Sequence, residues 1–121
     1  MKPFMNITKA LADENRVRLL MALQGGEVCV CQLVEFLGLA SSTVSKHLSI
    51  LHQAELIHSR KIGRWIYYSL PGREASSTVR SALRWVAQSL EEEPRIRADV
   101  KRLQQVLAMD PVALCKRQCR R

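Results

Sequence analysis

The sequence lacks any long apolar run, and no stretch approaches the ~18 apolar residues that a membrane-spanning helix requires. Its first residues, MKPFMNITKALADENR, lack an apolar signal-peptide core, because charge returns at Lys9 and Asp13. No Walker-type phosphate loop, dinucleotide-binding fingerprint or Ser/His/Asp set is present. We therefore expect a cytoplasmic protein that makes no membrane contact and is not an enzyme.

The sequence also has no internal repeats, low-complexity tracts or obvious linker. Its 121 residues, 47% of them hydrophobic, suffice for one domain with a real core. We expect a single winged-helix DNA-binding and dimerisation domain over residues 1–107. Residues 108–121 would then form a basic, cysteine-containing tail.

Positive charge is in excess. Nineteen Lys and Arg residues against eleven Asp and Glu residues give a net charge of +8 and a pI near 9.9. Such a cation favours polyanions, with nucleic acid the first candidate and anionic membrane the second. The excess gathers at Arg60, Lys61 and Arg64 and in the tail CKRQCRR.

The spacing of apolar residues predicts six helices and one hairpin. Steps of three and four place helices near residues 4–11, 14–23, 30–37, 41–55, 79–90 and 96–107. Asp13 and Ser41 are expected as N-caps. Around Gly63, β-branched and aromatic residues predict two strands joined by a turn. Four helices, a two-stranded hairpin and two further helices, in that order, make a mainly α winged helix-turn-helix.

The fourth helix carries short polar side chains opposite its apolar face, as groove reading requires. The hairpin is cationic, which suits contact with DNA phosphates. Trp65, Tyr67 and Tyr68 are expected to pack the hairpin onto the core. We therefore expect DNA contacts from Ser42, Thr43, Ser45, Lys46, His47, Ser49, Arg60, Lys61 and Arg64.

Two stretches, CVCQL ahead of the helix-turn-helix and GRWIYYSL in the second wing strand, resemble the ArsR/SmtB family of metal(loid)-responsive repressors. The similarity covers most of residues 4–90 and is greatest to arsenic-responsive ArsR members. It implies a homodimer that binds an inverted-repeat operator and leaves it when an inducer binds. It also implies an interface from the first and fifth helices. Their apolar stripes are Phe4, Ile7, Leu11, Val79, Leu83, Val86 and Leu90, for which burial in the monomer core is the competing interpretation.

Cys29 and Cys31 are one residue apart at the start of the third helix. In a cytoplasmic protein they suggest metal binding or thiol chemistry, although buried, inert thiols are the plainer interpretation. Within a regular helix the two side chains point to opposite faces, whereas in an extended segment they share one side. One ion therefore binds both only if the helix start is extended or unwound.

The resemblance implies a thiolate site at this C-x-C sequence. The arsenite pattern supplies a third cysteine three residues later, where this chain has Val34. We hypothesise that Cys115 or Cys119, from either subunit, completes a three-sulfur site with Cys29 and Cys31. The alternative is that the tail pair forms a separate site or has no role. The family's zinc site on the fifth helix is excluded, since residues 75–90 contain no His or Asp.

The leading prediction is a repressor of a metalloid-resistance operon, released when As(III) or Sb(III) binds cysteine thiolates. Cd(II), Pb(II) or Zn(II), or thiol oxidation, is the alternative signal within the same fold. A small thiol-redox enzyme that uses Cys29 and Cys31 is the alternative of another class. Its weakness is the spacing, which is not the C-x-x-C arrangement of such enzymes.

Overall fold

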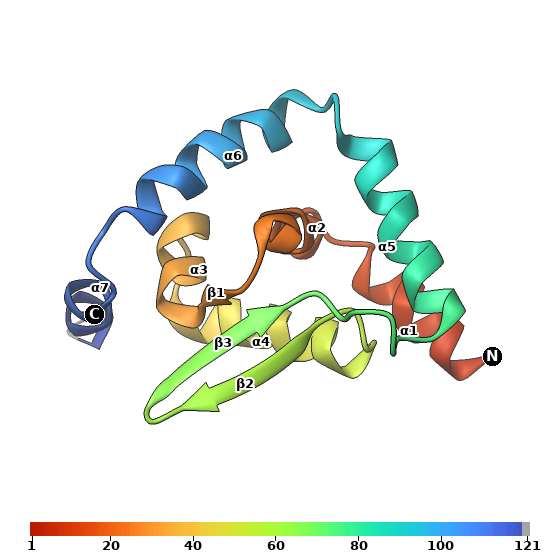
Figure 1. Ribbon diagram of the computed structural model, residues 1–121, viewed down its shortest axis with the longest axis horizontal. Helices are drawn as coiled ribbons and strands as arrows, with labels where there is room; N and C mark the ends of the chain where they lie inside the picture. The colour runs from red at the N-terminus through yellow and green to blue at the C-terminus, as the bar shows by residue number, and fades with distance from the viewer. Residues whose placement is uncertain (120–121) are drawn as a thin grey trace.

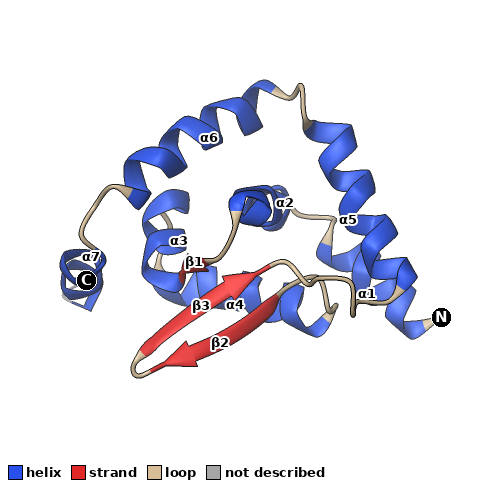
Figure 2. Ribbon diagram, in the orientation of Figure 1, coloured by secondary structure: helices blue, strands red, loops and turns tan. Residues whose placement is uncertain are grey.

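The computed structural model describes residues 1–119, with the backbone alone for Cys119. The winged-helix prediction is confirmed, and the predicted hairpin is the pair β2–β3 (Figure 2). The structure adds a short first strand, β1, and a helix, α7, within the predicted tail. The elements are α1 (Lys2–Ala10), α2 (Glu14–Ala22), η1 (Leu23–Gly25), β1 (Val28–Cys29), α3 (Val30–Leu37), α4 (Ser41–Gln53), β2 (His58–Ile62), β3 (Trp65–Ser69), α5 (Ser77–Leu90), α6 (Pro94–Leu107) and α7 (Pro111–Cys119).

The three strands form one antiparallel sheet in the order β1-β3-β2. Gly63 makes the turn of the hairpin with a φ of 62°, a left-handed value that favours glycine. Strand β1 pairs Cys29 with Tyr67, so the chain is extended immediately before α3 begins. The sheet therefore fixes where the C-x-C segment changes from extended to helical.

The core lies between α2, α3 and α4. Its fully buried members include Leu19, Leu33 and Leu48, each with 0% exposure. Asp13 caps α2 as predicted, accepting hydrogen bonds from the backbone N–H groups of Asn15 and Arg16. The predicted cap at Ser41 is wrong. Ala40, in an extended conformation, is the N-cap of α4, and Ser41 is already the first helical residue.

Helices α5 and α6 form an arch over α2, and the two ends of the described chain lie on opposite sides of the molecule (Figure 1). A buried ion pair anchors the arch: Arg18 of α2 donates to both carboxylate oxygens of Asp99 of α6, at 2.9 and 3.0 Å. The Arg18 guanidinium also lies 5.5 Å from the ring centre of Phe36. Helix α6 is thereby held against α2 and α3, and it leads the chain to α7 beside α3.

Candidate functional site

Helix α4 presents the predicted polar face to solvent. Ser42, Thr43, Ser45, Lys46 and Ser49 are all exposed. The opposite face is in the core, with Val44, Leu48 and Leu51 each 0% exposed. The helix therefore offers hydroxyls and one ammonium group on a surface that bulky side chains do not cover, which is the arrangement that groove reading requires.

An open hollow of about 520 Å³ lies at this face, which we call the α4 hollow. Arg16 of α2 enters it and lies 3.2 Å from Nδ1 of the half-buried His47. Sequence reasoning missed Arg16, because 31 positions separate it from His47 and no periodicity connects them. The hollow is lined by Arg16, Ser42, Thr43, Lys46, His47 and Ile50.

The hairpin differs from the prediction at Arg60. Lys61 and Arg64 are exposed near the turn, as contact with phosphate requires. Arg60 instead donates two hydrogen bonds to the Glu27 carboxylate, at 2.6 and 2.7 Å, and lies 5.6 Å from the centre of the Tyr67 ring. This hydrogen bonding holds the pKa of Glu27 below its ordinary value. The guanidinium is thus paired with a carboxylate of the protein, while 61% of its side chain is exposed.

The wing aromatics are on both faces of β3, because side chains alternate along a strand. Trp65, Tyr67 and Tyr68 are all half-buried, and Tyr68 packs against the core cluster. Burial raises the pKa of Tyr68. The predicted packing onto the core is confirmed for Tyr68, whereas Tyr67 lies beside the Arg60 guanidinium.

Two of the predicted thiols come together. Cys31, the second residue of α3, forms a disulfide with Cys115 of α7, with the two Cα atoms 5.6 Å apart and 84 positions between them in sequence. Cys29 carries a free thiol that is 2% exposed. The Cys119 side chain lies outside the described residues.

Contacts other than the sulfur bond also hold α7 on α3. Leu114 is 2% exposed and belongs to the core cluster. Arg117 donates to the Glu35 carboxylate at 2.8 Å, and Arg102 of α6 lies 3.6 Å from the same group. The Gln118 side-chain amide donates to the backbone carbonyl of Cys31, at 2.8 Å. Apolar packing and hydrogen bonds therefore stabilise the position of Cys115 beside Cys31 in addition to the disulfide.

Cys29 is held apart from this pair. It is the N-cap of α3 with extended backbone angles, φ −73° and ψ 147°, and its N–H donates to the Gln32 side chain at 3.1 Å. Side chains of residues 1–118 form no group of three His, Cys, Asp or Glu residues placed to hold a metal ion. The hypothesised three-sulfur site is thus not assembled among them, whereas Cys31 and Cys115 are brought together, and on reduction their thiolates would suit thiophilic ions.

The residues of the predicted dimer stripes divide into buried, half-buried and exposed groups. Ile7, Val79 and Val86 are buried, at 5%, 2% and 6% exposure, and the first two belong to the core cluster. Ile7 and Val79 are therefore buried within the monomer, as the competing interpretation predicted. Phe4 remains 52% exposed, and Trp85 of α5, which the spacing argument omitted, is 65% exposed. The half-buried members are Leu11, Leu83 and Leu90.

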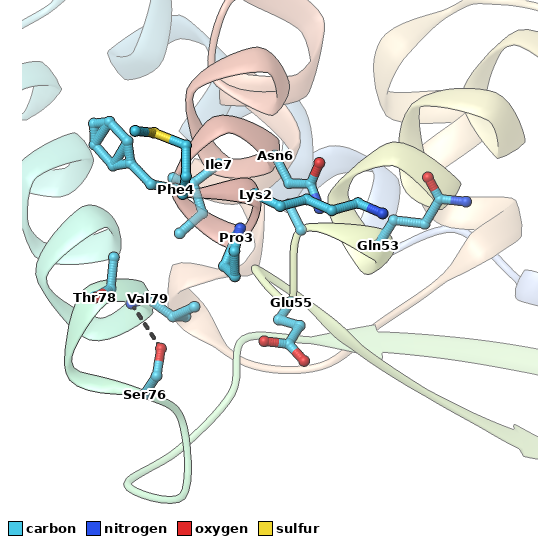
Figure 3. Close-up of a pocket in the computed structure, with 12 residues that line it drawn as sticks. Lys2, Pro3, Phe4, Asn6, Ile7, Gln53, Glu55, Ser76, Thr78 and Val79 are labelled. Carbon is cyan, nitrogen blue, oxygen red and sulfur yellow. Dashed lines mark hydrogen bonds between the residues drawn. The ribbon is translucent and has the colours of Figure 1, made fainter.

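A second open cavity, of about 540 Å³, lies between α1, the end of α4 and the start of α5 (Figure 3). Phe4, Ile7 and Val79 line it, with the polar side chains of Gln53 and Glu55 at its other side. This cavity is on the α1 side of the molecule, away from α7 (Figure 1). It contains no cysteine and therefore takes no part in the thiol pair.

Comparisons with known proteins agree with the winged-helix fold. The model of the family described as "Bacterial regulatory protein, arsR family" matches residues 13–59. The Bacillus subtilis arsenical resistance operon repressor is 40% identical over 76 residues, which are 62% of this chain and 72% of that protein. The chain belongs to the ArsR/SmtB family.

One further relative and one solved structure are similar to this chain. The transcriptional repressor SmtB homolog of Synechocystis is 42% identical over 83 residues, or 69% of this chain, which spans only 60% of that relative's length. The solution structure of the homodimeric winged helix-turn-helix domain Mb0332 from Mycobacterium bovis superposes with a TM-score of 0.61 at 27% identity. The superposition covers 76% of this chain and 83% of the Mb0332 chain. Within the described residues no helix is both long and apolar enough to cross a bilayer.

Proposed function

We propose that this ArsR/SmtB-family protein is a cytoplasmic homodimeric repressor that arsenite or antimonite releases from an inverted-repeat operator. Helix α4 enters the major groove, and Lys61 and Arg64 of the wing contact phosphates. Phe4 of α1 and Trp85 of α5 supply exposed apolar area for the dimer, as the resemblance implies. The observation that carries the sensing part is the pairing of Cys31 with Cys115 at the first turn of the helix-turn-helix unit.

In the reduced protein the two thiols condense with the inducer. Arsenite, As(OH)₃, forms an As–S bond with each of Cys31 and Cys115 and releases one water for each thiol. A third thiolate replaces the remaining hydroxyl, and the third ligand is Cys29 of the same subunit or Cys119 of either subunit. Thiolate donors with no nitrogen or oxygen ligand suit a soft ion, so Cd(II), Pb(II) and Zn(II) remain the competing inducers.

Recruitment of Cys29 would alter the DNA-binding unit. Cys29 lies in an extended segment and Cys31 within the helix, so both reach one ion only when the first turn of α3 unwinds. Unwinding breaks the bond from the Cys29 N–H to the Gln32 side chain. An inducer that binds the unwound form more tightly shifts the population away from the operator-binding form by its differential affinity.

The first test is fluorescence anisotropy of a labelled duplex from the gene's own promoter, with reduced protein titrated with arsenite. We expect salt-sensitive binding and release by arsenite in the wild type. Cys31→Ser should bind the duplex equally well and ignore arsenite. A wild-type protein that binds the duplex and ignores arsenite would refute the inducer, and one that does not bind would refute the repressor.

Thiol oxidation is the second candidate signal, because the structure contains the Cys31–Cys115 disulfide. Hydrogen peroxide converts the two thiols to the disulfide, taking up two electrons and two protons and leaving two waters. Release by peroxide and not by arsenite in the same anisotropy experiment would favour this signal over the metalloid.

A further inference from the structure

The Arg16 side chain connects three helices. Its Nε donates to the carbonyl oxygen of Ala10 at 2.8 Å and one terminal nitrogen donates to that of Lys9 at 3.0 Å, both at the end of α1. Its other terminal nitrogen lies 3.2 Å from Nδ1 of His47 in α4. With 13% of the side chain exposed, Arg16 is held in this position by contacts on several sides.

This geometry sets the protonation of the His47 ring. A guanidinium carries only donors, so the Nδ1 atom facing it must accept the hydrogen bond. A neutral imidazole has one donor and one acceptor nitrogen, and the proton is therefore on Nε2. Arg16 thus selects one of the two tautomers of His47.

The other ring nitrogen, Nε2, is accessible to solvent. Within residues 1–118 no side chain or backbone group accepts a hydrogen bond from Nε2. Since no buried polar side-chain atom of these residues lacks a partner, Nε2 is not buried. His47 lines the α4 hollow together with the hydroxyls of Ser42 and Thr43 and the Lys46 ammonium group. The hollow therefore gathers hydrogen-bond donors on the predicted DNA-binding face.

We propose that Arg16 is a positioning residue for operator binding. It fixes His47 as the Nε2–H tautomer and turns that N–H into the α4 hollow, as a neutral donor to a DNA phosphate oxygen. This inference rests on the proposed operator binding. Because Arg16 acts through His47 and touches no phosphate itself, its loss leaves the number of neutralised phosphates unchanged.

The first test measures the imidazole nitrogen-15 shifts of the free, reduced protein at neutral pH. The chain has three histidines, so the signal that disappears in His47→Gln is that of His47. We expect Nδ1 unprotonated and Nε2 protonated in the wild type, and a mixture of tautomers in Arg16→Met. A proton on Nδ1 in the wild type, or a ring unchanged by Arg16→Met, would overturn the proposal.

The second test measures operator affinity for Arg16→Met, His47→Ala and the double variant over a range of salt concentrations. We expect each single variant to bind about tenfold more weakly, as for loss of one well-placed hydrogen bond. The double variant should bind no more weakly than His47→Ala, and the salt slope should stay that of the wild type. Additive losses, or a slope reduced by about 0.9 in Arg16→Met, would show a direct phosphate contact instead.

Arg97→Met is the matched control, because Arg97 is an exposed arginine on α6 whose ion pair is with Glu92. It should leave affinity, slope and tautomer unchanged. If Arg16→Met fails to fold, the wild-type tautomer and the salt slope of His47→Ala still decide the question. A wild-type protein that ignores the duplex would refute operator binding, whereas normal binding by Arg16→Met would refute the positioning role alone.

Discussion

The α4 surface and the α3–α7 junction are built in different ways. On α4 the exposed residues and the buried residues follow from one helical period, so neighbouring positions determine the surface. At the junction, Cys31 and Cys115 meet across 84 positions, through the arch of α6 and the docking of α7. A binding surface of the first kind tolerates changes elsewhere, whereas a site of the second kind depends on every element that brings its parts together.

The largest expected effect tests the anchor of the arch. Asp99→Ala removes the partner of Arg18, whose side chain is 9% exposed, and leaves an unpaired buried charge. We expect the free energy of unfolding to fall by about 3–5 kcal/mol, measured by urea denaturation. The control is Arg95→Ala, because Arg95 lies 3.7 Å from the same carboxylate but is 55% exposed, so its loss should be within about 0.5 kcal/mol. Equal losses in both variants would contradict the anchor.

The next effect separates the two regions. Leu114→Ala removes the buried apolar contact of α7 and should cost about 2–4 kcal/mol of docking free energy. In the reduced protein we expect alkylating reagents to label Cys31 faster, with operator affinity unchanged. Val112→Ala, at a position that is 47% exposed, should change neither. Weakened operator binding by Leu114→Ala would show that the two regions are not independent.

A substitution on α4 should have the opposite pattern, with weaker operator binding and unchanged cysteine reactivity. Lys46→Ala removes an exposed ammonium group from the α4 hollow. We expect roughly tenfold weaker operator binding and a salt slope smaller by about 0.9, because one phosphate contact is lost. The reactivity of Cys31 and Cys115 toward alkylating reagents should remain that of the wild type. Unchanged affinity would place the DNA contacts elsewhere on the molecule.

The smallest effect lies within the wing. Lys61→Ala should reduce the salt slope of operator binding by about 0.9, whereas Arg60→Ala should reduce it by less than half as much. Arg60 is already paired with the Glu27 carboxylate, so its charge is partly neutralised before DNA arrives. Equal slopes for the two variants would mean that Arg60 exchanges Glu27 for a phosphate when the complex forms.

The same ion pair has a pH signature. The pKa of Glu27 is below its ordinary value, chiefly because Arg60 donates to the carboxylate. The contribution of the pair to stability is therefore present above the unfolded-state pKa of Glu27 and is lost as pH falls through the lower, folded-state value. Wild type should lose slightly more stability than Arg60→Ala across that acid range, measured by thermal unfolding.

Local patterns were enough to predict the helices, the hairpin and the Asp13 cap, because each depends on residues within one or two helical turns. They were also enough for the exposed face of α4. They were insufficient for strand β1, a two-residue element that exists because β3 lies beside it. The same reason explains why three contacts could not be predicted: that of Arg16 with His47, that of Arg60 with Glu27, and the docking of α7 on α3. Each of them joins segments that are distant in sequence.

The cysteines show where the boundary falls. The C-x-C spacing indicated a shared site at the start of α3, where Cys29 is extended and Cys31 is helical. From this spacing we expected Cys29 and Cys31 to be the two main ligands of one ion. The structure instead pairs Cys31 with Cys115, because α7 docks beside the first turn of α3. Cys29 is buried and carries a free thiol.

The most direct test of the account is arsenite release measured for Cys115→Ser alone. Cys115 is not among the residues that line the α4 hollow, so operator affinity should equal that of the wild type. The account predicts that arsenite no longer releases this variant, since only the tertiary pairing makes Cys115 part of the sensor. Release at wild-type arsenite concentrations would contradict this, and would show that sensing by the other cysteines does not need Cys115.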